Sequence, residues 1–221
     1  IVIHWGGKNI KKKLDEQNID SKFINGLRVT DEKIIKIVED ALLELNIEIL
    51  NNINNRKAKA QSVTPKNENI IKIVPEKKEL GFVGKPKKIN KEVLINLVRE
   101  KKVPIVVPLG IGDDGKIYNI NADIAAGAIA KEINSRRLLL MTDVEGVLDK
   151  NNKLILEINS DIAKRMMGEG IISGGMIPKI NTCIDAVENG VTGVVIVNGK
   201  KPHSILFELF SDKGSGTLIR K

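Results

Sequence analysis

Aromatic residues, cysteine and histidine are all scarce in this chain of 221 residues, and each shortage argues against a class of function. Aromatic side chains make up only 3% of the residues, so the stacking surfaces of single-strand nucleic-acid binders are in short supply. The one cysteine, Cys183, excludes an internal disulfide and is interpreted as a small buried hydrophobe in a reducing compartment. The two histidines, His4 and His203, are too few to favour a histidine metal site.

Long apolar runs are missing as well. No window approaches the ~18 to 20 uninterrupted apolar residues that a membrane-spanning helix needs, and no charged leader opens the chain. We therefore expect a cytoplasmic protein with no membrane partner.

The net charge of +8 is compatible with binding to a polyanion. Because the lysines are interspersed with acidic residues on predicted helix faces, we expect no nucleic-acid partner, and a basic RNA-binding protein remains the alternative.

What the sequence does contain is a regular alternation of apolar patterns with helical and strand periods, which is the signature of an α/β fold with a parallel sheet. Helices are predicted at 91–101, 122–132, 161–167, 176–188 and 204–210, and strands at 104–109, 138–141, 193–197 and 216–219. The first part is predicted to hold a strand at 1–4, a lysine-rich helix to about 18, a hairpin or loop at 23–29, a helix from Thr30 that breaks near Asn46, and short strands and turns at 57–84.

Three glycine sites stand where a predicted strand ends and a helix begins. They are Trp5-Gly6-Gly7, the run from Thr142 to Gly146, and Gly174-Gly175-Met176. Glycine lets backbone N–H groups approach an oxyanion, and the helix N-terminus beyond it adds favourable partial charge. The alternative for each site is an ordinary turn. Taken together, the three sites support anion binding and ordinary turns equally.

Several polar residues are candidates for binding an anionic substrate. The run from Asn119 to Asp123 places two amides and a carboxylate before a helix, although capping needs only one of them. Lys179, one turn into the helix after Gly174, is suited to phosphate oxygens, and Arg28 is suited to bidentate binding of a small carboxylate. The alternatives are a solvated lysine and an exposed arginine near an acidic helix start. The GxxxxGK[ST] phosphate loop and a nucleophile elbow are both missing from the sequence.

In chain order, seven segments resemble those of the N-acetylglutamate kinases of the amino acid kinase family, over essentially the whole chain. They read HWGG (4–7), GLRVTD (26–31), ELGFVGKP (79–86), YNINAD (118–123), LLLMTDVEGVLD (138–149), ISGGMIPK (172–179) and PHSILFELFSDKGSGTLI (202–219). The combination of GLRVTD with GGMIPK distinguishes this branch from aspartokinases, carbamate kinases and uridylate kinases.

The resemblance implies a three-layer α/β/α sandwich around a mainly parallel sheet, formed by a single domain over residues 1–221. Within it, about 1–101 is the acetylglutamate-binding half and about 102–221 the ATP-binding half. The implied reaction transfers the γ-phosphoryl group of ATP, with Mg²⁺, to the γ-carboxylate of N-acetyl-L-glutamate, the second step of arginine biosynthesis. The implied assembly is a homodimer or higher homo-oligomer, with no metal site made by the protein alone.

The resemblance also assigns roles to individual residues. The substrate-binding residues are Gly6, Gly7, Arg28 and Asn119. The ATP-binding residues are Thr142, Asp143, Gly146, Gly174, Met176 and Lys179. Lys179 is in addition catalytic, stabilising the charge on the transferring phosphoryl group, and Asp123 orients the groups around it. Because a carboxylate nucleophile needs no general base, such a site works by alignment and charge neutralisation.

The chain also departs from the family pattern. Trp5 stands where a third glycine is expected and Lys8 where a proline is expected, and we expect Trp5 to crowd the loop. The family's first strand, with a lysine that clamps the phosphates, precedes the position of Ile1, and Lys8 does not replace that lysine. The alternative is therefore an impaired homologue or fragment that binds ligand or a partner subunit without turnover. The residues His203, Glu208, Gly214 and Gly216 are similar to an arginine-sensing pattern.

Overall fold

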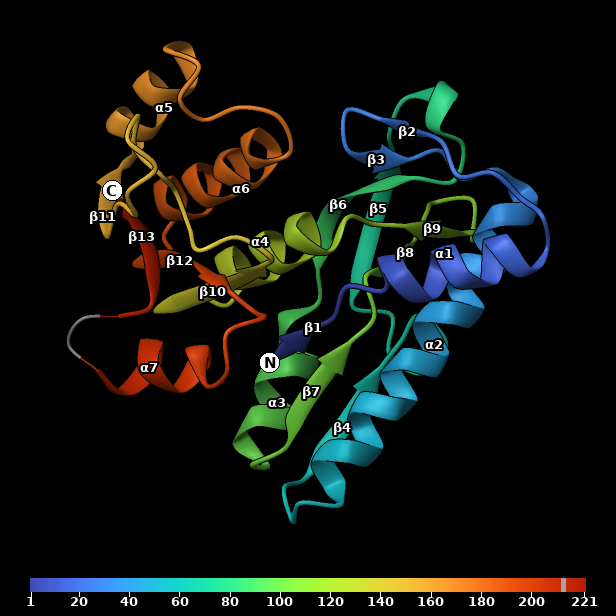
Figure 1. Ribbon diagram of the computed structural model, residues 1–221. Coiled ribbons are helices and arrows are strands. Elements are labelled where there is room, and N and C mark those ends of the chain that lie inside the picture. Colours follow the sequence, from blue (N-terminus) through green and yellow to red (C-terminus); the bar gives the residue numbers. More distant parts are fainter. Residues whose placement is uncertain (212–213) are drawn as a thin grey trace. The chain divides into compact units, whose positions relative to one another are not determined.

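The computed structural model describes residues 1–211 and 214–221 and shows an α/β protein (Figure 1). Its contacts divide the chain into two compact units, Ile1–Ile129 and Ala130–Lys221. Each unit contains both helices and strands. The functional boundary expected near residue 101 falls inside the first unit, and the assignment of one substrate to each half stays a prediction.

The first unit is built on a parallel sheet and a mixed sheet. The parallel sheet has the order β1-β7-β4 and the mixed sheet the order β6-β5-β8-β9, and β2 and β3 form a separate hairpin. The strands are β1 (Val2–Ile3), β2 (Phe23–Ile24), β3 (Leu27–Arg28), β4 (Ala60–Val63), β5 (Ile71–Pro75), β6 (Gly84–Ile89), β7 (Val103–Val106), β8 (Leu109–Ile111) and β9 (Ile117–Asn119). The helices are α1 (Gly7–Glu16), α2 (Glu32–Asn54), the short η1 (Lys78–Leu80), α3 (Lys91–Arg99) and α4 (Ala122–Glu132), which continues into the second unit.

The second unit contains one four-stranded sheet of order β10-β12-β13-β11. Its strands are β10 (Arg137–Thr142), β11 (Glu157–Asn159), β12 (Gly193–Asn198) and β13 (Gly216–Arg220), and its helices are α5 (Ser160–Gly168), α6 (Met176–Glu188) and α7 (Ser204–Phe210). The β10/β12 and β11/β13 pairs are parallel, whereas β12/β13 is antiparallel. All residues from 193 to 197 are buried, as a continuous apolar run in a central strand requires. The α/β fold class is therefore confirmed.

Most predicted elements are present, and the helices α4, α6 and α7 have the predicted bounds. The strand predicted at 104–109 instead forms two strands, β7 and β8. The break falls at Val107 and Pro108, where the amide of Leu109 donates to the carbonyl of Val107 at 2.8 Å. Proline has no N–H with which to extend a sheet ladder, so one continuous strand could not be maintained there.

The predicted break of the second helix near Asn46 is wrong, because α2 is continuous from Glu32 to Asn54. The Asn46 side chain is fully buried. Its Nδ2 donates to the carbonyl of Ile105 at 3.0 Å and lies 3.2 Å from His4 Nε2, while Ser62 Oγ donates to its Oδ1. Bonds to neighbouring strands therefore outweigh the low intrinsic helix propensity of asparagine.

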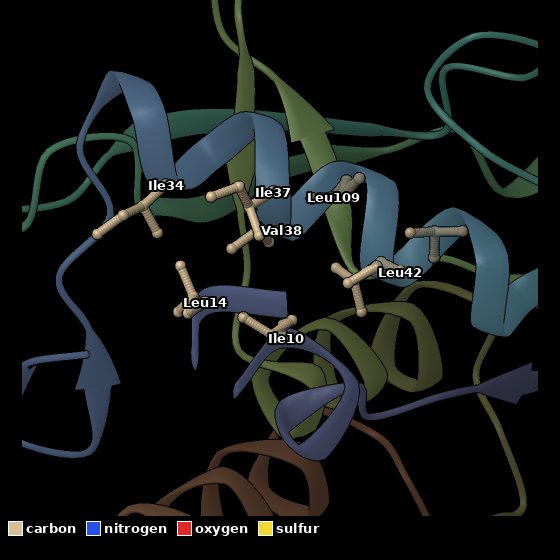
Figure 2. Packing of buried hydrophobic residues seen from close by; sticks show 9 residues of the cluster. Ile10, Leu14, Ile34, Ile37, Val38, Leu42 and Leu109 are labelled. Carbon is tan, nitrogen blue, oxygen red and sulfur yellow. The ribbon is translucent and has the colours of Figure 1, made fainter. Parts of the chain in front are cut away.

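An apolar cluster between α1 and α2 holds the start of α1 in place (Figure 2). Ile10 and Leu14 of α1 face the side chains of Ile34, Val38 and Leu42 of α2, at the spacing that puts residues on one helix face. Figure 2 also shows Ile37 and Leu109 at this cluster. The segment Trp5-Gly6-Gly7 is called the glycine loop below. Since Ile10 follows this loop by three residues, the packing of Ile10 fixes the position of the loop.

Among the described residues, the helices lack the combination of length and apolar character that crossing a membrane demands. Cys183 is buried in α6, as predicted for a small apolar side chain.

Candidate active site

A cavity of about 480 Å³ in the first unit brings together all four of the predicted substrate-binding residues. Gly6 and Gly7 at the start of α1, Arg28 on β3 and Asn119 at the end of β9 all contribute to its wall. Asn119 lies more than 90 positions beyond the other three residues in the sequence, and the volume is in the range of small-molecule sites. The spatial grouping of these residues is thus a finding, while their roles remain a prediction.

The two loop glycines leave no room for a side chain. A Cβ on Gly6 would overlap the Leu42 side chain, and a Cβ on Gly7 would lie 2.5 Å from Cε2 of Trp5. Gly7 is the first residue of α1, so the N–H groups of the first turn lack acceptors within the helix and carry partial positive charge. This end of the cavity is therefore suited to an anionic group held by backbone N–H donors.

Arg28 supplies a buried positive charge to the same cavity. Only 8% of its surface is exposed, and its guanidinium donates to Ser21 Oγ and lies 4.7 Å from the centre of the Phe23 ring. Burial lowers the pKa of Arg28, since desolvation penalises the charged form, yet a guanidinium remains protonated in proteins. The described part of the chain places no carboxylate in an ion pair with Arg28, which leaves its charge available to an anionic ligand.

Arg28 is held in place by the residues that flank it. Asn25 and Gly26 both have positive φ, 49° and 81°, as expected for the tight turn of a two-residue hairpin. On the other side, the buried Thr30 donates its hydroxyl to the carbonyl of Arg28 at 2.9 Å, and Asp31 caps α2. The sequence predicts a helix that begins at Thr30, but nothing in the sequence indicates the buried hydrogen bond from the Thr30 side chain to Arg28.

The run from Asn119 to Asp123 divides its roles among its polar side chains. Asn121 Oδ1 accepts from the amides of Asp123 and Ile124 at 2.9 and 3.2 Å, and so it caps α4. Asn119 is therefore not needed as a cap and lines the cavity, while Asp123 is half-buried in the first turn of α4. The expectation that capping needs only one of these residues is confirmed.

The predicted nucleotide residues lie in the second unit. Thr142 ends β10 and is in register with Asn198 at the end of the parallel strand β12, and Asp143 follows Thr142. Gly174, with φ 57°, and Gly175 precede α6, and the half-buried Lys179 lies in its first turn. Helix α6 leads back into β12, so its first turn lies toward the carboxyl ends of these strands, where ligands bind in open α/β sheets.

Comparison with known proteins identifies the family to which these features belong. The model of the amino acid kinase family matches residues 1–198. The chain belongs to the amino acid kinase family.

Relatives within that family are similar over the full chain. The acetylglutamate kinase of Pelagibacter ubique (strain HTCC1062) is 56% identical over 221 residues, which are 100% of this chain and 77% of that protein. The acetylglutamate kinase of Clostridioides difficile (strain 630) is 46% identical over 100% of this chain and 79% of its own length. The resemblance to the acetylglutamate kinase branch is thereby confirmed. Among solved structures, smu.665 from Streptococcus mutans UA159 superposes with a TM-score of 0.86 at 31% identity, covering 100% of this chain and 85% of that one.

One glycine of this amino acid kinase has a packing role that explains its presence without a ligand. Gly146 has φ 150° and is buried, and a Cβ there would lie 2.6 Å from Thr217 Oγ1. That hydroxyl accepts from the amide of Val147 at 2.8 Å and donates to the carbonyl of Ile155 at 2.6 Å. The contact of Gly146 with ATP stays a prediction.

His4, next to the glycine loop, is predicted to make the stability of this amino acid kinase depend on pH. The side chain is 6% exposed, and burial lowers its pKa from 6.5 to about 4. Between these values the unfolded chain binds a proton that the folded chain does not, so stability falls as the pH drops from 6.5 towards 4. At about 1.4 kcal/mol per pKa unit, the full loss is about 3 kcal/mol.

Urea unfolding from pH 7.5 to 4.5 checks this prediction. The His4→Asn variant is expected to lose most of the slope between pH 6.5 and 5, where few carboxylates titrate. His203→Asn is the matched control, because His203 is exposed, and it is expected to keep the slope. An equal slope in the wild type and in His4→Asn would contradict the assignment.

Proposed function

We propose that this chain transfers the γ-phosphoryl group of ATP to the γ-carboxylate of N-acetyl-L-glutamate, which is the second step of arginine biosynthesis. The observation that carries the proposal is the single cavity that contains Gly6, Gly7, Arg28 and Asn119 in a member of the amino acid kinase family. Relatives named acetylglutamate kinase, 43 to 56% identical, support the same assignment. We further propose a homodimer or higher homo-oligomer that works in the cytoplasm.

The acceptor is bound at two ends of the cavity. Arg28 binds the α-carboxylate through a bidentate pair, because its planar fork matches the two carboxylate oxygens. The N–H groups of Gly6 and Gly7 hold the γ-carboxylate and the phosphoryl group as it moves. Asn119 binds the acetylglutamate between these ends, since its amide both donates and accepts hydrogen bonds.

The nucleotide is bound in the second half of the chain. Thr142, Asp143 and Gly146 follow β10, and Gly174 and Met176 open α6, so that backbone N–H groups at the helix start meet the phosphates. Lys179 adds a positive charge in the same turn. Hydroxyl and carboxylate oxygens are ligands that Mg²⁺ accepts, so Thr142 and Asp143 fit an ATP–Mg²⁺ complex, in which the metal neutralises phosphate charge.

The reaction depends on the positioning of the acceptor and ATP more than on acid–base catalysis. A γ-carboxylate oxygen forms a bond to the γ-phosphorus while the bond from that phosphorus to the β–γ bridging oxygen breaks, and its electron pair leaves with ADP. The carboxylate is already ionised at neutral pH, so no proton has to be removed. Lys179 stabilises charge on the transferring group, and Asp123 orients the groups around it.

Calorimetric titration tests the substrate assignment before any turnover is measured. N-acetyl-L-glutamate is expected to bind at least about tenfold more tightly than L-glutamate, since the uncharged acetamide avoids placing an ammonium group beside Arg28. L-aspartate and uridylate serve as comparison ligands and are expected to bind weakly. Equal affinity for L-glutamate and its acetylated form would contradict the proposal.

A further inference from the structure

Trp5 lines the cavity that contains Gly6, Gly7, Arg28 and Asn119, and none of the roles proposed above involves it. It is the only tryptophan of the chain. Its indole lies against the α-carbon of Gly7, because a Cβ on that glycine would lie 2.5 Å from Cε2 and 2.8 Å from Cη2 of the ring. The ring lines the cavity and is nevertheless 65% exposed. The expectation that Trp5 crowds the glycine loop is therefore confirmed.

The cavity has an aromatic ring beside each of its two anion-binding groups. Phe23 lies under the guanidinium of Arg28, and Trp5 lies on Gly7 at the first turn of α1. An acid held through both carboxylates has to span from Arg28 to the glycine loop. The space beside Gly7 then limits the length of the carbon chain between the two carboxylates of the acid. The bulky ring of Trp5 takes up room there that a glycine at position 5 would leave empty.

We propose that Trp5 sets the upper limit on the length of the acceptor, admitting N-acetyl-L-glutamate and rejecting the acid with one more methylene group, N-acetyl-L-2-aminoadipate. This inference rests on the proposed function, since it takes the glycine loop as the site of the acceptor carboxylate. One methylene group in a tight pocket changes affinity or rate by about 10-fold to 200-fold. Shorter acids are unaffected by such a wall, because they fall short of the glycine loop instead of colliding with the ring.

Calorimetric affinities for three acids test the length limit. The acids are N-acetyl-L-aspartate, N-acetyl-L-glutamate and N-acetyl-L-2-aminoadipate, measured with the wild type, Trp5→Gly and Trp5→Phe. In the wild type we expect the glutamate derivative to bind at least about tenfold better than the aminoadipate derivative. Trp5→Gly is expected to reduce that ratio to nearly one while leaving discrimination against the aspartate derivative unchanged, and the smaller ring of Trp5→Phe is expected to give an intermediate ratio.

Phe23→Leu is the matched control, because Phe23 is the other aromatic residue that lines the same cavity and its ring lies against Arg28 rather than Gly7. It is expected to weaken binding of all three acids by a similar factor and to leave their ratios unchanged. The inference would be overturned if Trp5→Gly kept the wild-type ratio of affinities for the glutamate and aminoadipate derivatives. It would also be overturned if Phe23→Leu lost that ratio.

Intrinsic fluorescence supplies a second and independent readout, since Trp5 is the sole tryptophan. Saturation with N-acetyl-L-glutamate is expected to shift the emission to shorter wavelength as the exposed ring is covered. Unchanged emission at a concentration that calorimetry shows to be saturating would overturn the role of Trp5 and leave the proposed function standing. If the wild type binds no N-acetyl-L-glutamate, the proposed function fails, and the inference fails with it.

Discussion

Replacing Lys179 with alanine is expected to lower turnover by about 10² to 10³, the effect of removing one preorganised donor that stabilises developing charge. Lys179 lies in the first turn of α6, and this helix directly follows Gly174 and Gly175, whose missing Cβ atoms let backbone N–H groups approach an anion. In the proposed reaction its ammonium acts on phosphate oxygens of ATP and not on the acceptor. The KM for N-acetyl-L-glutamate is therefore expected to stay within about threefold of the wild type, because the lost interactions are with ATP and the transferring phosphoryl group and not with the bound acceptor.

Steady-state ADP release measures this effect, with Lys164→Ala as the matched control. Lys164 lies on α5 of the same unit, and its exposed ammonium pairs with Glu188 at 2.6 Å. An exposed ion pair contributes little to stability, so this variant is expected to keep its turnover. A near-normal turnover in Lys179→Ala would place the phosphate site elsewhere, as would an equal loss in both variants.

Replacing Arg28 with lysine is expected to weaken binding of N-acetyl-L-glutamate by about 10-fold to 100-fold, which corresponds to the loss of roughly one hydrogen bond to a charged group. Lysine offers a point charge where arginine offers a planar fork, and it also loses the bond to Ser21 and the contact with Phe23. Because the α-carboxylate lies away from the bond that forms, turnover at saturating substrate is expected to change much less than affinity.

Calorimetric affinity and turnover, measured on the same preparation, separate these two effects. Arg99→Lys is the control, because Arg99 is an exposed residue at the end of α3 in the same unit and lies outside the cavity lining. It is expected to leave both quantities unchanged. A fall in turnover at unchanged affinity for Arg28→Lys would show that Arg28 acts on the reacting group and would refute its assignment to the α-carboxylate.

Much of the fold could be predicted because local periodicity and tertiary packing agree. In α6, Ile180, Cys183, Ile184 and Val187 recur at helical spacing and are buried, and the bounds of α4, α6 and α7 matched the prediction. The predicted and observed elements differ where residues distant in the sequence determine the local structure. Asn46 was expected to break α2 on propensity alone, but its amide bonds to strands β4 and β7, which are separated from it in the sequence. Such partners are invisible to any window along the chain.

The candidate site was predictable to a similar degree. The glycine loop, Arg28 and Asn119 were selected by residue type and motif, and the fold gathers them in one cavity. Ser21 and Phe23 went unrecognised as partners of Arg28, because they belong to a short loop and hairpin with no strong pattern. For Gly146 the motif suggested a ligand, whereas the close approach of Thr217, 71 residues later, gives a packing reason that no local pattern contains.

Trapping of the product with hydroxylamine tests the central claim most directly. The protein is incubated with ATP, Mg²⁺ and either N-acetyl-L-glutamate or L-glutamate, and hydroxamate and ADP are measured together, since hydroxylamine converts an acyl phosphate into a hydroxamate. We predict one hydroxamate for each ADP with N-acetyl-L-glutamate and only background with L-glutamate. ADP release without hydroxamate, or equal hydroxamate from the two acids, would contradict the assignment of this chain as an acetylglutamate-phosphorylating enzyme.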